Sequence, residues 1–122
     1  MPPDIQIMVE HGIIRVVYDG LVEYDVVTEM LRQVGQIALE TPGERLLFDI
    51  RKADYTHYYL GTIRHAEEGP ALGIDRRFRI AFLGSKGNPM LKYIEDVAVN
   101  RGYQVKAFVV EQEAIAWLQH SP

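Results

Sequence analysis

The sequence contains no cysteine at all. This absence excludes disulfide bonds, thiolate metal ligands and cysteine nucleophiles, and it fits a chain that works in a reducing compartment. The first residues, which read Met-Pro-Pro-Asp, also lack the basic and apolar regions of a secretory signal peptide. We therefore expect a cytoplasmic protein.

Positive charge is scarce as well. Lys and Arg number 13 against 17 Asp and Glu, the net charge is -4, and there is no long basic run. Because proteins that bind the nucleic-acid backbone normally carry a basic surface, we expect no nucleic-acid partner. No apolar segment approaches the length of a membrane span, so no membrane-spanning helix is expected either.

The rest of the composition is that of an ordinary globular protein. The chain has 122 residues, of which 48% are hydrophobic and 25% are charged. A chain of this length is usually one domain and can bury a core without cross-links. We expect a single domain over residues 1–122.

The chain opens with a pattern typical of a β-hairpin. Two β-branched runs, over residues 5–10 and 13–18, flank the pair His11-Gly12. A link of two residues that includes glycine favours antiparallel pairing of the strands on either side. Residues 19–20, Asp-Gly, are expected to end the second strand.

Helical and strand-like patterns then alternate. Helices are expected over residues 23–40, 57–68, from 89 to about 101, and 111–119, and strands over residues 45–50, 78–83 and 105–110. Strands that alternate with helices need crossover connections, which place the strands parallel. The order ββαβαβαβα therefore predicts an α/β fold: a mostly parallel five-stranded sheet with an antiparallel N-terminal edge hairpin and about four helices.

In a sheet of this kind, ligands gather beyond the carboxyl ends of the parallel strands. Three loops should meet there, over residues 19–22, 51–56 and 84–88. Polar and aromatic side chains of these loops and of the adjoining helix starts are the candidates for binding a ligand or partner: Arg51, Asp54, Thr56, Tyr58, Tyr59, Ser85, Lys86 and Asn88.

The loop over residues 84–88 leads from a strand into a helix that Asn88 would cap and Pro89 would begin. Its free backbone N–H groups, together with Lys86, would suit an anion. The plainer interpretation is a turn that uses glycine for its geometry and asparagine as a cap. The spacing matches neither a P-loop nor a dinucleotide-binding fingerprint.

The sequence gives little support for a catalytic or metal-binding function. Asp49 and Asp54 would form a general acid and base if burial separated their pKa values, but a local salt bridge for Asp49 is the simpler expectation. Ser85 lies outside a nucleophile elbow. His57 and His65 fall about 12 Å apart along one helix, too far for a single metal ion. We expect no catalytic residue, no metal site and no cofactor.

Three tyrosines, Tyr55, Tyr58 and Tyr59, lie with Leu60 around the start of the second helix. Aromatic side chains with a polar tip are common in protein interfaces and in the walls of apolar pockets. They also serve as ordinary core residues, and the pattern leaves both interpretations open.

Several segments carry a resemblance to a known family. The strand Leu46-Leu-Phe-Asp-Ile50, the segment Phe78-Arg-Ile-Ala-Phe-Leu-Gly84, and Val105-Lys-Ala-Phe108 followed by Glu113-Ala-Ile-Ala-Trp117-Leu118 resemble the SpoIIAA-like family of STAS-related domains. The resemblance covers most of the chain. It implies a STAS-like α/β sandwich and bacterial, cytoplasmic relatives that are mostly uncharacterised.

The resemblance also exposes a departure. Anti-sigma-factor antagonists of this type carry a phosphorylatable serine at the start of the second helix, where this chain has His57-Tyr58-Tyr59-Leu60 and no serine. Thr56 or Thr62 would be the nearest substitutes, although the spacing argues for neither.

Three functions follow as hypotheses. The first is a non-enzymatic binding or regulatory module of STAS-like type, with a protein partner. The alternative is a carrier of a small apolar ligand, which a closed apolar cavity beneath the second helix would favour. The third is an enzyme that uses Asp49, Asp54 or Lys86. The exposed edge of the N-terminal hairpin would also allow a homodimer.

Overall fold

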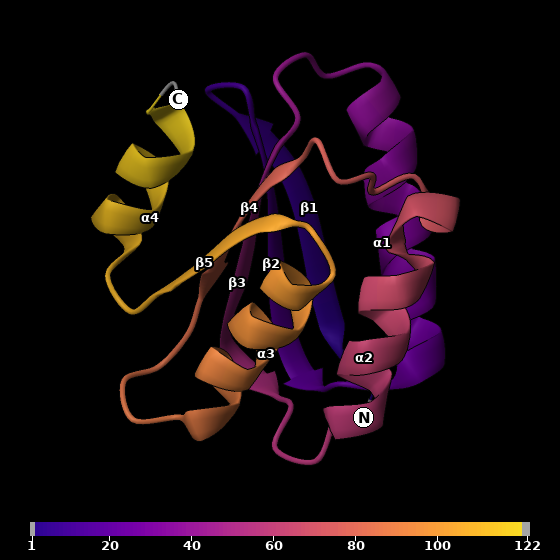
Figure 1. Cartoon of the computed structure of the whole chain (residues 1–122), viewed down its shortest axis with the longest axis vertical. Coiled ribbons are helices and arrows are strands. Elements are labelled where there is room, and N and C mark those ends of the chain that lie inside the picture. Colours follow the sequence, from indigo (N-terminus) through magenta and orange to yellow (C-terminus); the bar gives the residue numbers. More distant parts are fainter. Residues whose placement is uncertain (1, 121–122) are drawn as a thin grey trace.

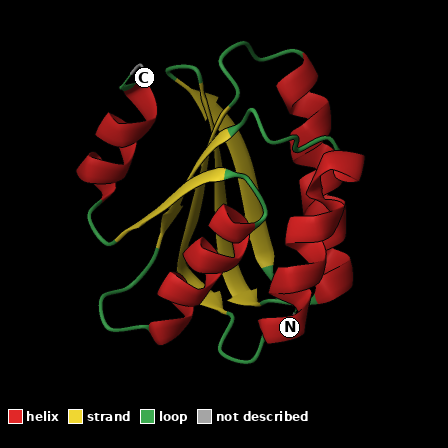
Figure 2. Cartoon of the chain, in the orientation of Figure 1, coloured by secondary structure: helices red, strands yellow, loops and turns green. Residues whose placement is uncertain are grey.

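The structure, a computed structural model, describes residues 2–120. One sheet runs in the order β1 (Asp4–Glu10), β2 (Ile13–Leu21), β3 (Arg45–Asp54), β4 (Arg79–Leu83) and β5 (Gln104–Phe108). The helices are α1 (Tyr24–Leu39), α2 (Tyr59–Glu68) with the short 3-10 helix η1 (Gly69–Leu72) behind it, α3 (Pro89–Asn100) and α4 (Glu111–Gln119). The strand β1 is antiparallel to β2 and the other neighbours are parallel, so the expected fold class is confirmed (Figures 1 and 2).

The N-terminal hairpin has the tight turn that the sequence predicts. Glu10 pairs with Ile13, and the two residues between them, His11 and Gly12, have φ angles of 54° and 77°. Positive φ at both central residues is the geometry of a type I′ turn, whose twist matches that of the flanking strands. The hairpin therefore places β1 at one edge of the sheet.

Two strand ends differ from the expectation. The strand β2 continues through Asp19 and Gly20 to Leu21, with a shift of register after Val17, because the parallel ladder to β3 resumes beyond the irregularity. For the same reason β3 extends to Asp54 instead of ending at residue 50. Asp-Gly thus does not end the second strand, and the β-bulge before it takes up one extra residue of β3 inside the ladder.

The boundaries of two other elements also move. The helix α2 begins at Tyr59, two residues later than expected, and its sole fully buried residue is His65. Tyr59, the first residue of α2, is 49% exposed. The strand β5 covers Gln104–Phe108, so Val109 and Val110 lie beyond it. The predicted start of α3 is confirmed, because the Asn88 side chain accepts a hydrogen bond from the Met90 N–H at 3.0 Å.

Helices cover both faces of the sheet. Figure 1 shows α4 on one side and α1 and α2 on the other. Alternate strand residues supply two separate cores, because successive side chains of a strand point to opposite faces. The core on the α1 side includes Ile14, Val16, Phe48 and Ile80, and the core on the α4 side includes Ile13, Leu47, Ala81, Leu83, Ala114 and Leu118.

The buried face of α1 contains a glycine for a steric reason. Met30, Leu31 and Val34 face the sheet, and Gly35 follows them inside the helix. A Cβ atom at Gly35 would lie 2.4 Å from the carbonyl oxygen of Leu72. Gly35 therefore allows α1 and η1 to come into backbone contact, which offsets the cost of glycine in a helix.

Among residues 2–120, no helix is long and apolar enough to cross a membrane.

Candidate functional site

The loops at the carboxyl ends of the parallel strands do meet, as expected. The Val22 N–H donates to the Asp54 carbonyl at 2.9 Å, and the Ser85 hydroxyl lies 3.5 Å from the Arg51 carbonyl. Arg51, Asp54, Thr56, Ser85 and Lys86 are all exposed here. Their proximity is a consequence of parallel strand packing, and it does not by itself make a binding site.

The polar side chains at this edge are engaged in local structure. The Asp54 carboxylate accepts hydrogen bonds from the Thr56 N–H at 3.3 Å and from its hydroxyl at 2.9 Å, which closes a turn after β3. Asn88 caps α3. For the loop over residues 84–88, the plainer interpretation of a turn with an asparagine cap therefore accounts for the contact that Asn88 makes.

Asp49 belongs to a cluster of ion pairs on the α4 side of the sheet. Its carboxylate is 2.7 Å from the Arg51 guanidinium and 3.3 Å from that of Arg15, and Arg15 also reaches Glu111 at 2.8 Å. Burial alone would raise the pKa of Asp49, but hydrogen bonds from Arg51 and Arg15 hold its pKa below the ordinary value. Asp49 is therefore ionised at neutral pH, and its partners differ from those of Asp54.

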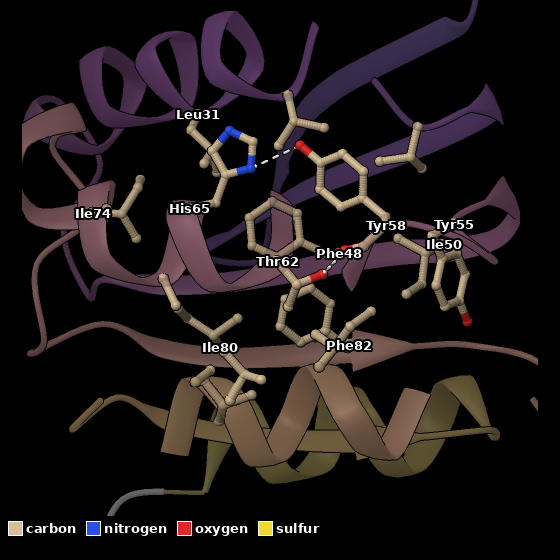
Figure 3. A pocket seen from close by; sticks show the side chains of 18 of the residues that line it. Leu31, Phe48, Ile50, Tyr55, Tyr58, Thr62, His65, Ile74, Ile80 and Phe82 are labelled. Carbon is tan, nitrogen blue, oxygen red and sulfur yellow. Dashed lines mark hydrogen bonds between the residues drawn. The ribbon is translucent and has the colours of Figure 1, made fainter. Parts of the chain in front are cut away.

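The most distinctive feature of the molecule is an apolar cavity of about 160 Å³ beneath α2 (Figure 3). Strand residues that line it include Val16, Phe48, Ile50, Ile80, Phe82 and Val105, and helix residues that line it include Met30, Leu31, Ile94, Val97 and Ala98. The sheet forms its floor and the three helices α1, α2 and α3 form its walls. Among the described residues that line it, none is Asp, Glu, Lys or Arg.

The three tyrosines around the start of α2 divide between two roles. Tyr55, which is 4% exposed, and Tyr58 line the cavity. Tyr59 points outward instead, and its ring packs edge-on against Tyr93 with the ring centroids 5.2 Å apart. Tyr55 and Tyr58 thus lie in the wall of an apolar cavity, which is one of the interpretations that the sequence leaves open, whereas the exposed Tyr59 is not an ordinary core residue.

His65 is the polar centre of the cavity wall. Its Nε2 lies 2.8 Å from the Thr28 hydroxyl and its Nδ1 lies 2.9 Å from the Tyr58 hydroxyl, the contact drawn in Figure 3. The imidazole also stacks on Tyr24 and on Tyr58, at centroid distances of 4.5 and 5.8 Å. Burial lowers the pKa of His65, so the ring is neutral at neutral pH.

From the sequence alone His65 is a poor metal ligand, and its place in the cavity wall is not predicted. The signal was present in the spacing of residues 58, 62, 65, 66 and 69, which all line the cavity. This spacing is that of one helical face with small or aromatic side chains. Within residues 2–120 there is no group of three or more His, Asp or Glu residues that could hold a metal ion.

The two threonines near the start of α2 differ in accessibility. The Thr62 hydroxyl donates to the Tyr58 carbonyl at 2.6 Å and its side chain lines the cavity, as Figure 3 shows. Thr56 is exposed. Of the two nearest substitutes for the missing serine, Thr56 is thus the accessible one.

Comparison with known proteins identifies the fold class. The chain has the SpoIIAA-like, STAS-type α/β fold, as its sequence resemblance implies. It is similar to the crystal structure of an uncharacterised DUF3478-family protein with a SpoIIAA-like fold from Shewanella loihica PV-4, with 19% sequence identity, a TM-score of 0.59, and coverage of 95% of this chain and 93% of that chain.

A second solved structure is an anti-sigma factor antagonist from Mycobacterium paratuberculosis. It shares 8% sequence identity with this chain, with a TM-score of 0.65 and coverage of 98% of this chain and 96% of that chain. Searches of family models and of curated proteins find no match. At these identities the likeness establishes the fold, and the function has to be argued from the site.

Proposed function

We propose that residues 1–122 form a single non-enzymatic binding module of STAS-like type, and that the module takes a small apolar ligand in the cavity beneath α2. The observation that carries this proposal is the cavity itself, about 160 Å³ in volume and lined almost entirely by hydrocarbon. Apolar pockets with a few well-placed polar groups are the usual form of small-molecule sites.

The energetics of the cavity support binding. Side chains around an empty apolar space lose dispersion contacts, and water gains little there because it finds few polar partners. An apolar molecule restores those contacts and removes its own surface from water. The ligand is therefore expected to stabilise the folded chain, by about 2.7 kcal/mol at a concentration of 100 times Kd.

Binding is favoured over chemistry by the state of the cavity's polar groups. Both nitrogens of His65 are occupied by hydroxyl groups, and the Thr62 hydroxyl is held by a backbone carbonyl. Nucleophilic or acid–base catalysis needs a group that is free to reach a substrate. The ionisable cluster around Asp49 lies on the other face of the sheet, among the residues that pack near α4.

The first test is native mass spectrometry of the freshly purified protein, under gentle and then denaturing conditions. A bound ligand appears as extra mass that is lost on denaturation. In parallel, isopropylbenzene is added to ligand-free protein, and the thermal unfolding midpoint is expected to rise. A bare mass together with an unchanged midpoint would contradict the proposal.

Two matched variants test whether isopropylbenzene raises the unfolding midpoint by binding in the cavity. Ala98→Leu adds a side chain inside the cavity wall, whereas Ala116→Leu makes the same change at an exposed position of α4. We expect Ala98→Leu to abolish the isopropylbenzene shift and Ala116→Leu to retain it. Circular dichroism checks that both variants are folded.

A second candidate function, binding of a protein partner, has its own support. Tyr59 and Leu60 are 49% and 76% exposed on α2, a few residues after the exposed candidate Thr56. Exposed aromatic and aliphatic side chains are typical anchors of interfaces. The Mycobacterium paratuberculosis neighbour is named as an anti-sigma factor antagonist, which points to a protein partner. For either candidate function, we expect the protein to act in the cytoplasm.

A photo-crosslinking residue tests this second candidate. Placed at position 60, it should join the chain to another protein in the host cell, and at position 9, on the edge strand β1, it should report a homodimer. Val9 is 50% exposed. The control is the same residue at position 116 on α4, and equal products at all three positions would argue against a defined interface.

A further inference from the structure

Resting on the proposed role of the cavity, we propose that its ligand is an uncharged molecule with one aromatic ring and no hydrogen-bonding group, and that this ring packs against the side chains of Phe48 and Phe82.

The volume sets the size of the ligand. An apolar cavity of about 150 Å³ holds one benzene molecule in a well-packed protein interior. The cavity of about 160 Å³ found here is of that size. A long acyl chain exceeds it, while a ring with one short substituent matches it once the flexible Met30 side chain adjusts.

The floor of the cavity contains a pair of aromatic rings. Phe48 of β3 and Phe82 of β4 are register partners on neighbouring strands, and their rings stack with the centroids 5.2 Å apart. Both side chains line the cavity, as Figure 3 shows. Aromatic rings gain more from offset stacking or edge-to-face contact than from the burial of area alone. A third ring beside this pair makes such contacts, and a saturated molecule of similar shape does not.

Most polar side chains of the wall are already paired within the protein. The hydroxyls of Tyr18 and Tyr103 donate to backbone carbonyls at 2.8 and 2.7 Å. Tyr58, Thr62 and the His65 ring are bonded to protein groups as described above. These groups therefore have their partners before any ligand enters.

The remaining hydroxyl among the described lining residues, that of Tyr55, does not face the cavity. It is buried without a partner and lies close to Gly84, since a Cβ atom there would be 3.2 Å from the oxygen. Gly84 does not line the cavity, and in Figure 3 the hydroxyl points away from the other labelled side chains. A hydroxyl or carbonyl group of a ligand would therefore leave water without finding a partner.

The wall also determines the charge of the ligand. Among the described lining residues there is no cationic or anionic side chain, and burial keeps the His65 ring neutral by lowering its pKa. A carboxylate or ammonium group in this space would lose its hydration without gaining a counter-charge. The ligand is therefore uncharged.

The test uses four probes that differ in one property each. Isopropylcyclohexane has a saturated ring in place of the aromatic ring of isopropylbenzene, 1-phenylethanol has a hydroxyl in place of one methyl group, and benzoate adds a negative charge. Each is titrated into the full chain while amide NMR signals are followed. We expect isopropylbenzene to bind, 1-phenylethanol to bind at least about tenfold more weakly, and benzoate at least about 100-fold more weakly.

The variant that tests the aromatic contact is Phe82→Leu, which removes the ring and keeps an apolar side chain. We expect it to lower the affinity for isopropylbenzene about fivefold more than the affinity for isopropylcyclohexane. Phe108→Leu is the matched control, because Phe108 is also a partly buried strand residue but packs against the core on the α4 side. Phe108→Leu should leave both affinities unchanged, and circular dichroism checks that both variants are folded.

A measurement on the wild-type chain tests the same contact without a substitution. Nuclear Overhauser effects are expected between the ring protons of bound isopropylbenzene and those of Phe48 and Phe82. Their absence in a saturated complex would show that the ring does not pack against this pair.

The outcomes separate the two proposals. If isopropylbenzene does not bind the wild-type chain, both the proposed function and this inference are wrong. If it binds but Phe82→Leu weakens both hydrocarbons equally, the cavity is a ligand site and the aromatic contact is wrong. If 1-phenylethanol or benzoate binds as tightly as isopropylbenzene, the exclusion of hydrogen-bonding or charged groups is wrong.

Discussion

The hydroxyl of Tyr58 lies 2.9 Å from Nδ1 of His65, so the residue that precedes α2 is tied to a residue two turns further along the same helix. The other ring nitrogen reaches Thr28 on α1 at 2.8 Å. One imidazole therefore connects the start of α2, its middle and the neighbouring helix. Because α2 buries few other side chains, this contact has a large share in holding the wall of the cavity in place.

Removing the imidazole should cost considerable stability. His65→Ala leaves the Tyr58 and Thr28 hydroxyls without their partner and enlarges the cavity. We expect a loss of about 3 kcal/mol in the free energy of unfolding, measured by urea denaturation. His57→Ala, at an exposed position before the same helix, should change that free energy by less than about 0.5 kcal/mol. Equal effects would show that the network does not stabilise the fold.

The same histidine predicts a pH dependence of stability. Burial lowers the pKa of His65 in the folded chain below the ordinary 6.5; the charge of Arg64 acts in the same direction, and that of Glu68 opposes both. Below pH 6.5 the unfolded chain then binds a proton that the folded chain does not. The stability contribution is complete above the unfolded pKa and is lost as the pH falls through the lowered folded pKa.

We therefore expect the free energy of unfolding to fall on acidification from pH 7 to pH 5 in the wild type, and to fall less in His65→Gln. Glutamine keeps hydrogen-bonding capacity without titrating. Parallel curves for the two proteins in this range would rule out His65 as the group responsible.

The ion-pair cluster on the α4 side should contribute to the free energy of unfolding and should not affect ligand binding in the cavity. Asp49→Asn leaves Arg15 and Arg51 beside a neutral group. We expect a loss of about 2 kcal/mol, below the usual range for buried pairs because the Arg51 side chain is 43% exposed. Binding of isopropylbenzene should persist within about threefold. Asp54→Asn, at an exposed position, is the control and should cost less than about 1 kcal/mol.

The close contact between α1 and η1 predicts intolerance of a methyl group. In Gly35→Ala the new Cβ atom would lie 2.4 Å from the Leu72 carbonyl oxygen, so the two segments must separate. We expect the unfolding free energy to fall by about 2 kcal/mol despite the better helix propensity of alanine. Gln36→Ala, exposed on the same helix, should be neutral or slightly stabilising.

The missing serine leads to a prediction about modification. The Thr62 hydroxyl is held by the Tyr58 carbonyl in the cavity wall, which makes it a poor kinase substrate in the folded chain. Because residues His57 to Leu60 contain no serine, a kinase that modifies STAS serines should leave this segment unmodified, as judged by intact-protein mass spectrometry. Stoichiometric phosphate on Thr56 or Thr62 would show that a threonine replaces the usual serine.

Much of the fold was predictable because local chemistry and global packing agree. The Gly12 turn, the Asn88 cap and the helical spacing of Met30, Leu31 and Val34 each specify their own segment, and together they specify the order of elements. The end of β2 was not predictable in this way. Asp19 and Gly20 disfavour a strand locally, but ladder hydrogen bonds to β3 outweigh that preference.

The candidate site residues at the strand ends stay a prediction. In the structure they are exposed or partly exposed side chains, some of them engaged in a turn, a helix cap or an ion pair. The sequence indicates Tyr58 but not His65 as a candidate, because a single histidine in a helix carries no indication of its partners. Thr28 and Tyr24 lie on a different helix, and contacts between helices are decided by packing.

The sequence by itself determined the alternation of strands and helices, the hairpin and the absence of thiol chemistry, because each depends on neighbouring residues or on composition. The tertiary structure alone decided that the Tyr55 ring lines an apolar cavity while Tyr59 is exposed, and that Arg15, 34 residues away in the chain, also pairs with Asp49. Burial, pKa and cavity volume arise from residues far apart in the chain, and the pattern of any one segment does not contain them.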